Sequence, residues 1–278
     1  VETENDFGTQ GSPPTHPELL DWLAVEFQES GWSLKHLHRC IVRSATYGQA
    51  STARPDLREI DPLNRWLARQ NRLRLDAEII RDVALAASGQ LDRSLGGPPV
   101  QPPQPAGLGA FTQSNRDWMA SGGGQRVRRA LYTRIQRATL HPALAVFDAP
   151  DTFTTCTRRL RSNTPLQALA GLNEPTLLEA ARAFGQRILS EGGPNDAARV
   201  DYAFTRCVGR PPTASEHWRL LSFVQQQEQS FRSDPKAAAA LIQVGVAPRP
   251  ADLEARKLAV WMTLANVLFN LDETLTKG

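Results

Sequence analysis

An arginine-rich stretch just past the middle of the chain carries the best candidate for anion chemistry. Arg158, Arg159 and Arg161 lead into Asn163 and Thr164, where the pattern predicts the N-terminus of a helix. Guanidinium groups form forked hydrogen bonds with carboxylates and phosphates, and the free N–H groups of a helix N-terminus favour negative charge. These residues therefore predict a site for an anionic ligand.

Two acidic residues, Asp148 and Asp151, precede this cluster. In one interpretation Asp148 joins the arginines and Asn163 in a ligand-binding or catalytic site. In the other, both acids pair with the arginines and pin the loop to the fold, because oppositely charged neighbours neutralise one another. The second interpretation is the simpler one.

A second set of polar residues is predicted near the N-terminus. Asn5, Asp6 and His16 flank a glycine-rich loop and can converge with Arg43 and Tyr47 in a polar pocket. The alternative is structural, because a single histidine near a helix N-terminus is more often a hydrogen-bonded structural residue than a catalytic one.

The spacing of histidines and cysteines predicts no metal site. His36 and His38 lie two residues apart on a predicted helix and so face different directions. Cys40, Cys156 and Cys207 form no C-x-x-C or C-x-x-C-H motif, which argues against local zinc and covalent haem sites. They fit either one disulfide with a spare thiol or three small buried side chains. No cofactor is predicted for this chain.

Tryptophan offers a further route to ligand contact, since indole rings stack on apolar faces. Most of the six tryptophans fall at apolar helical positions, which favours core packing. Trp118 lies in a Gly/Ser-rich stretch and is the exception.

Composition limits the classes of protein that fit. The 278 residues are 41% hydrophobic and 22% charged, enough for a substantial core. No apolar run reaches the roughly 20 residues of a membrane span. The net charge is +3, but basic residues are spread along the whole chain, so nucleic-acid binding is not predicted. Because Val1 is not preceded by a start methionine or a leader, we expect the chain to be a fragment of a longer protein.

Hydrophobic periodicity predicts a mainly α fold. Four helices are expected in the N-terminal part. The first begins at Thr15 and ends at Gly31, and the second follows a Ser33 cap. The third spans 62–70 after an Asp61 cap, and the fourth spans 76–88 before Gly89. The run 129–138 is ambiguous between helix and strand, and a helix is weakly favoured.

Further helices are expected in the C-terminal part. One follows an Asn163 or Thr164 cap, with Leu166, Leu169 and Ala170 facing inward, and another restarts at Pro175. A third covers about 197–208. A fourth begins at Thr213, with Glu216 completing a capping box, and the last runs from Asp252 to Leu271. The piece 230–250 is either a mobile linker or an extra helix.

The predicted fold is an irregular multi-helix domain with long Pro/Gly-rich loops. Residues 96–125, rich in glycine and proline, form a predicted loop or linker between an N-terminal helical part, 1–95, and a C-terminal helical part, 126–278. The three together are interpreted as one family domain.

Four segments in order along the chain resemble one known family. They read NDFGTQGSPPTHPELLDWLAVEF, IVRSATYGQAS, FDAPD with RSNTPLQALAGLNEPTLLEAAR, and WMTLANVLFNLDETLTK. They span residues 5–277 and are similar to the C-terminal domain of a planctomycete-associated family of unknown function (domain of unknown function 1553), truncated here at its N-terminus. Members are typically found at the end of large proteins that begin with a cytochrome-c-like domain.

The resemblance implies an exported protein of the periplasm or cell envelope. It implies that upstream domains of the same polypeptide are partners and that haem c belongs only to such an upstream domain. No catalytic residue is carried over from the family, and the residues do not decide whether the chain is an enzyme.

Two functions fit this reading. The first is an interaction or scaffolding module beside an electron-transfer domain. The second is an enzyme or binding domain that acts on extracellular polysaccharide or its oxidised products, using the arginine–asparagine cluster and Asp148.

Overall fold

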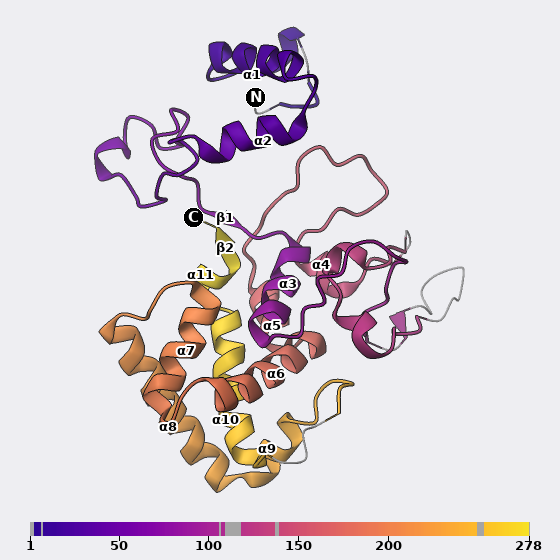
Figure 1. Ribbon diagram of the computed structural model, residues 1–278, viewed down its shortest axis with the longest axis vertical. Coiled ribbons are helices and arrows are strands. Elements are labelled where there is room, and N and C mark those ends of the chain that lie inside the picture. The colour runs from indigo at the N-terminus through magenta and orange to yellow at the C-terminus, as the bar shows by residue number, and fades with distance from the viewer. Residues whose placement is uncertain are drawn as a thin grey trace. The chain divides into compact units, whose positions relative to one another are not determined.

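The computed structural model describes residues 3–6, 8–105, 107–108, 118–136, 139–248 and 253–277. Its secondary structure is mainly α, as predicted, with a single short two-stranded sheet among the described residues (Figure 1). The α-helices are α1 (Pro17–Glu29), α2 (Leu34–Arg43), α3 (Ala77–Ser88), α4 (Pro142–Val146), α5 (Pro165–Asn173), α6 (Pro175–Glu191), α7 (Asp196–Val208), α8 (Ala214–Ser233), α9 (Pro235–Leu241), α10 (Ala255–Phe269) and α11 (Asp272–Leu275). The strands are β1 (Leu73–Arg74) and β2 (Thr276–Lys277).

The chain divides into two compact units. The smaller unit comprises Val1–Leu73, Cys156–Arg158 and Lys277–Gly278, and the larger comprises Arg74–Thr155 and Arg159–Thr276. The Pro/Gly-rich segment 96–125 falls within the larger unit. Its residues 106 and 109–117 lie outside the described part.

In the smaller unit, α1 and α2 form a helical hairpin. The N-cap of α1 is His16, one residue later than expected, and it makes no side-chain cap hydrogen bond. Gly31 adopts a positive φ of 70° between the helices, a conformation that glycine tolerates without strain. Ser33 caps α2 as predicted, since its hydroxyl accepts from the His36 N–H at 3.3 Å.

The predicted helix at 62–70 is wrong. The Asp61 carboxylate accepts hydrogen bonds from the N–H groups of Arg65 at 2.7 Å and Trp66 at 2.8 Å, while Asn64 and Leu67 take positive φ values of 51° and 55°. Short polar side chains compete in this way with helical hydrogen bonding. The segment is therefore a string of turns.

The core of the larger unit forms where α6 packs against α10. Phe184, Ile188, Met262 and Leu268 are fully buried, and the Phe184 and Phe269 rings stack 5.7 Å apart. Gly185 permits the close approach of these helices, since a Cβ there would lie 2.8 Å from the Met262 nitrogen. Figure 1 shows α7, α8 and α9 around this pair.

Other predicted helices of the larger unit have the expected boundaries. The helix at 76–88 is α3, closed by Gly89 at a φ of 79°, and the restart at Pro175 is α6. The segment 230–250 contains the extra helix α9, not only a linker. The predicted start of the last helix at Asp252 lies outside the described residues, and α10 itself begins after Glu254.

Two local expectations in the larger unit are wrong. Leu166 and Leu169 of α5 are each 58% exposed, whereas Gln167 between them is buried. The run 129–138, of which 137–138 lie outside the described residues, holds only a 3-10 turn at Ala130–Tyr132, and Thr133 then makes a parallel bridge to Val100. No helix among the described residues is both long enough and apolar enough to cross a membrane.

Candidate functional site

Asp148 organises the turn that precedes the arginine cluster. It follows α4 with a φ of 63°, and its Oδ2 accepts from the Ser162 N–H and Oγ, each at 2.7 Å, and from Gln167 Nε2 at 3.0 Å. Partial burial raises the pKa of Asp148, but the hydrogen bonds from Ser162 and Gln167 outweigh it, so the pKa lies below its ordinary value. This carboxylate is ionised and engaged within the fold.

The arginines of the predicted anion site pair with carboxylates of the chain itself. Arg159 makes a forked pair with Glu78 of α3, at 2.6 and 3.0 Å, and Arg161 lies 3.3 Å from the Asp76 carboxylate. The predicted partners, Asp148 and Asp151, make other contacts. Asp148 accepts from Ser162 and Gln167, and Asp151 accepts from the N–H groups of Phe153 and Thr154.

The remaining members of the cluster separate. Arg158 belongs to the smaller unit and is exposed, whereas Arg159 and Arg161 belong to the larger unit. Asn163 Oδ1 accepts from Arg74 Nη1 at 3.3 Å, and Thr164 caps α5 by accepting from the Gln167 N–H, also at 3.3 Å. Arg159 and Arg161 are thus held within the fold, but by Glu78 and Asp76 and not by the predicted Asp148 and Asp151.

A hollow of about 220 Å³ opens at this place in the larger unit, lined in part by Arg74, Asp76, Asp148, Arg161 and Gln167. The space within it that water-sized molecules can occupy is about 10 Å³, enough for about one water. Within the described residues, the buried atoms Gln167 Oε1 and Arg74 Nε have no hydrogen-bond partner. The hollow thus has polar walls, but room only for a very small ligand.

The second predicted polar set does not come together as one pocket. Asn5 donates to Thr157 Oγ1 at 2.8 Å, His16 Nδ1 contacts Thr15 Oγ1 at 3.0 Å, and the Tyr47 hydroxyl accepts from Lys277 Nζ at 2.8 Å. Asp6 and Arg43 are exposed. No hydrogen bond or ion pair within the described part of the chain joins any two of the five residues.

Sequence reasoning missed a buried polar cluster in the larger unit. Arg81, His141, Glu174 and Thr176 line one hollow of about 400 Å³ together with apolar side chains such as Phe147. Burial raises the pKa of Glu174, although the Leu177 N–H opposes the shift, and burial lowers the pKa of His141. These residues come from separate segments of the chain, so no local sequence motif predicts the cluster.

Arg81 and His141 have structural partners in this cluster. Arg81 donates to the carbonyls of Arg128 at 2.8 Å and Arg126 at 2.5 Å, and His141 Nε2 donates to the Pro103 carbonyl at 3.0 Å. Arg81 therefore holds residues 126–128 to α3, and His141 holds Pro103 to the start of α4. Of the four cluster residues, Arg81 and Thr176 each have a buried side-chain atom, Nε and Oγ1, without a hydrogen-bond partner.

A third group was also missed, in the smaller unit. Glu26 of α1 and His36 and Cys40 of α2 place one potential metal ligand each within 4.8 Å of one another. Glu26 Oε1 lies 2.5 Å and Cys40 Sγ 3.4 Å from the same nitrogen, His36 Nε2. The spacing His36-x₃-Cys40 puts both on one face of α2, a signal that the sequence does contain.

All three cysteines are free. Cys156 is exposed and Cys40 half-buried, while burial raises the pKa of the Cys207 thiol to about 12. Cys207 is therefore protonated at neutral pH and unreactive, as a small buried side chain should be.

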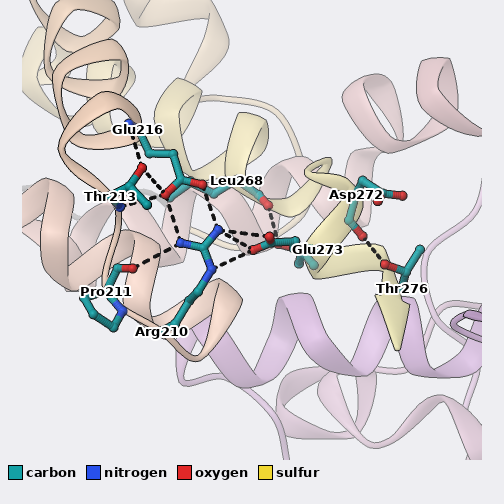
Figure 2. A network of polar contacts seen from close by, with 9 residues as sticks. Arg210, Pro211, Thr213, Glu216, Leu268, Asp272, Glu273 and Thr276 are labelled. Atoms are coloured by element: carbon teal, nitrogen blue, oxygen red, sulfur yellow. Dashed lines mark hydrogen bonds and ion pairs between the residues drawn. The ribbon is translucent and has the colours of Figure 1, made fainter. Parts of the chain in front are cut away.

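A network of hydrogen bonds and ion pairs surrounds Arg210 in the larger unit (Figure 2). Its guanidinium makes a forked pair with Glu216 at 2.7 and 2.9 Å and contacts the Glu273 carboxylate at 2.8 to 3.1 Å. Glu216 in turn completes the predicted capping box with Thr213. This network ties the start of α8 to α11, and its role is structural.

The tryptophans reverse the sequence expectation. Only Trp261 is buried, whereas Trp22, Trp32, Trp66 and Trp218 are each more than half exposed. Trp118, the predicted ligand-contact residue, is half-buried and donates to the Pro102 carbonyl at 2.6 Å.

These observations define a mainly α protein in which most of the predicted ligand residues are engaged in internal contacts. Comparison with family models gives the lineage: residues 1–224 match the model of PSD1, described as a protein of unknown function (DUF1553). The chain belongs to this family. No curated protein and no solved structure matches it.

Proposed function

We propose that the chain is an interaction module, and that the partner is an upstream domain of the same exported polypeptide, next to a cytochrome-c-like domain. The observation that carries the proposal is the exposure of apolar side chains on the α1–α2 hairpin. Leu20, Trp22, Trp32 and Leu34 are 48%, 52%, 66% and 59% exposed, and neither helix contains a buried residue. Exposed apolar patches of this kind mark interaction sites.

The pairing of the polar residues supports the same function. An enzyme of the predicted kind would present Arg159, Arg161 and Asp148 to a substrate, but each of these has a partner inside the larger unit. The periplasmic or cell-envelope location, the planctomycete origin and the haem-bearing neighbour follow from the family resemblance and form part of the proposal.

The test is a binding measurement in trans between the chain and the upstream part of the polypeptide. Trp22→Ala should weaken binding by roughly 30-fold or more, because buried tryptophans are typical hot spots worth about 2 kcal/mol or more. Trp218→Ala is the matched control, since Trp218 of α8 is 68% exposed but belongs to the larger unit. Equal affinities for the wild type and the Trp22 variant would overturn the proposal.

Binding of extracellular polysaccharide is a second candidate, favoured by the four exposed tryptophans, whose rings can stack on sugar faces. A thermal-shift titration with anionic and neutral polysaccharide fragments tests it. Saturable stabilisation that grows with concentration, and that Trp66→Ala abolishes, is the expected result. A flat response would exclude this candidate and leave the protein partner.

A further inference from the structure

The contact face of the α1–α2 hairpin carries an unusual set of residues. The half-buried positions of the two helices include the apolar Leu23, Phe27 and Leu37, as expected for a helical hairpin. They also include three potential metal ligands, one from α1 and two from α2, whose ligand atoms cluster together. We propose that Glu26, His36 and Cys40 bind one zinc ion that links α1 to α2.

The separation of the donor atoms fits such an ion. In a tetrahedral zinc site with Zn–S of about 2.3 Å and Zn–N of about 2.0 Å, the sulfur and nitrogen atoms lie about 3.5 Å apart. Cys40 Sγ and His36 Nε2 are 3.4 Å apart. Glu26 Oε1, now 2.5 Å from the same nitrogen, reaches the ligand separation by moving back by about 0.8 Å, a small rotation for an unbranched side chain.

A catalytic Cys–His–Glu arrangement does not fit this geometry. In a nucleophilic triad the acid orients the imidazole through one ring nitrogen, while the other nitrogen takes the proton from the nucleophile. Here both the thiol and the carboxylate address His36 Nε2. Three donor atoms within 4.8 Å of one another are instead the arrangement from which a metal site is built.

The donor set selects the kind of metal. A thiolate, an imidazole and a carboxylate are all ligands of zinc, whereas calcium and magnesium take oxygen ligands almost alone. Three protein ligands leave a fourth position for water or for a group from a partner.

The ion would stabilise a part of the chain that has little else to hold it. No residue of α1 or α2 is buried, and short helices gain most of their stability from packing. A structural zinc supplies folding free energy directly, because the ligands come together only in the folded state. The proposal thus departs from the sequence prediction of no metal site, which considered only spacing within one helix.

The test is metal binding to the full chain, kept reduced, after removal of metal by a chelator. One equivalent of zinc is expected to bind, and the cobalt-substituted protein should show a thiolate-to-cobalt charge-transfer band. Cys40→Ser should remove this band, and His36→Gln should weaken binding by more than the roughly 10- to 100-fold typical of a lost outer-shell partner. The affinity should also fall as the pH is lowered, because the ligands bind in their deprotonated forms.

Two variants provide matched controls. His38→Gln changes a histidine two residues away on the same helix, and Cys156→Ser removes the exposed thiol of the same unit. Both should bind zinc like the wild type. If they lose binding to the same extent, or if Cys40→Ser keeps the charge-transfer band, the proposal is wrong.

Hydrogen exchange of the wild-type protein, compared with and without zinc, tests the link without relying on a variant. Zinc should slow amide exchange across α1 and α2 in the wild type, and it should do so to a smaller extent in Glu26→Gln. In α6 and α10 the exchange rates should be the same with and without the metal. Zinc-independent exchange in the wild-type hairpin would contradict the proposed link.

Discussion

The two units of this chain are built in different ways. In the larger unit, apolar residues of α3, α6, α7 and α10 form one continuous buried cluster. In the smaller unit, the described residues with less than a tenth of their surface exposed are Asp61 and Asn64, both polar. The larger unit therefore holds itself together through hydrophobic burial, and the smaller unit through turns, caps and local polar contacts.

This difference shows where a partner or a ligand has most to contribute. Burial of apolar surface is the dominant favourable term in folding, so a unit without it is only marginally stable by itself. Both the interaction surface proposed for the hairpin and the proposed zinc ion lie in the smaller unit. In the larger unit, by contrast, the arginines of the predicted anion site already pair with carboxylates of that unit, Arg159 with Glu78 and Arg161 with Asp76.

The largest expected effect comes from cutting into the core of the larger unit. Phe184→Ala should lower the free energy of unfolding by about 3–5 kcal/mol, because Phe184 is fully buried and stacks on Phe269. Phe27→Ala in α1 should cost about 1 kcal/mol or less in the same transition, since Phe27 is only half-buried against Trp32. Denaturant unfolding followed by circular dichroism measures both. Similar losses would contradict the contrast between the units.

The helix caps should give an intermediate effect. Glu216→Gln should destabilise the protein at pH 7 by about 1 kcal/mol, because it removes the charge that pairs with Arg210 and leaves only a weaker, neutral acceptor for the Thr213 N–H in the capping box. His16→Ala in the smaller unit should have little effect, because the His16 side chain makes no cap hydrogen bond. Thermal unfolding of the two variants makes the comparison.

The cost of the Glu216 variant should also depend on pH in a defined direction. The hydrogen bonds from Arg210, then that from the Thr213 N–H, lower the pKa of Glu216 to about 2. A carboxylate with a depressed pKa stabilises the folded state above its unfolded pKa of about 4.3, and this contribution disappears as the pH falls towards 2. The difference in stability between wild type and Glu216→Gln should therefore shrink between pH 5 and pH 2. A constant difference would show that the charge of Glu216 is not involved.

Much of the helical fold could be predicted from the sequence, because periodicity and capping signals agreed there. Ser33, Thr213 and Gly89 mark helix ends by local chemistry that requires no knowledge of the tertiary fold. The predictions were wrong where polar side chains overrode the pattern. Asp61 turned an expected helix into turns, and Gln167 took the inward place expected for Leu166.

The candidate site was harder to predict, because its contacts join distant parts of the sequence. Arg159 pairs with Glu78, which lies 81 residues earlier, so the nearby Asp151 was the wrong partner to consider. The His36–Cys40 spacing was visible in the sequence, but the third ligand, Glu26, becomes a neighbour only when α1 folds back on α2. Pairing across a hairpin has no local signature.

The smallest expected effect concerns the surface ion pairs, a feature that the two units share. Arg161→Ala removes the pair with Asp76, and about 0–1 kcal/mol is expected because both side chains are more than a third exposed and solvent screens them. Arg54→Ala removes the forked pair with Asp56 in the smaller unit and should leave the unfolding midpoint unchanged. Denaturant titrations at low and high salt measure both. If either variant were as destabilising as Phe184→Ala, charge pairing, and not apolar burial, would account for the difference in stability between the two units.

Arg161→Ala also bears on the enzyme alternative. Loss of ligand binding with unchanged stability would assign this arginine to a ligand-binding site, whereas a loss of stability alone would assign it to the fold.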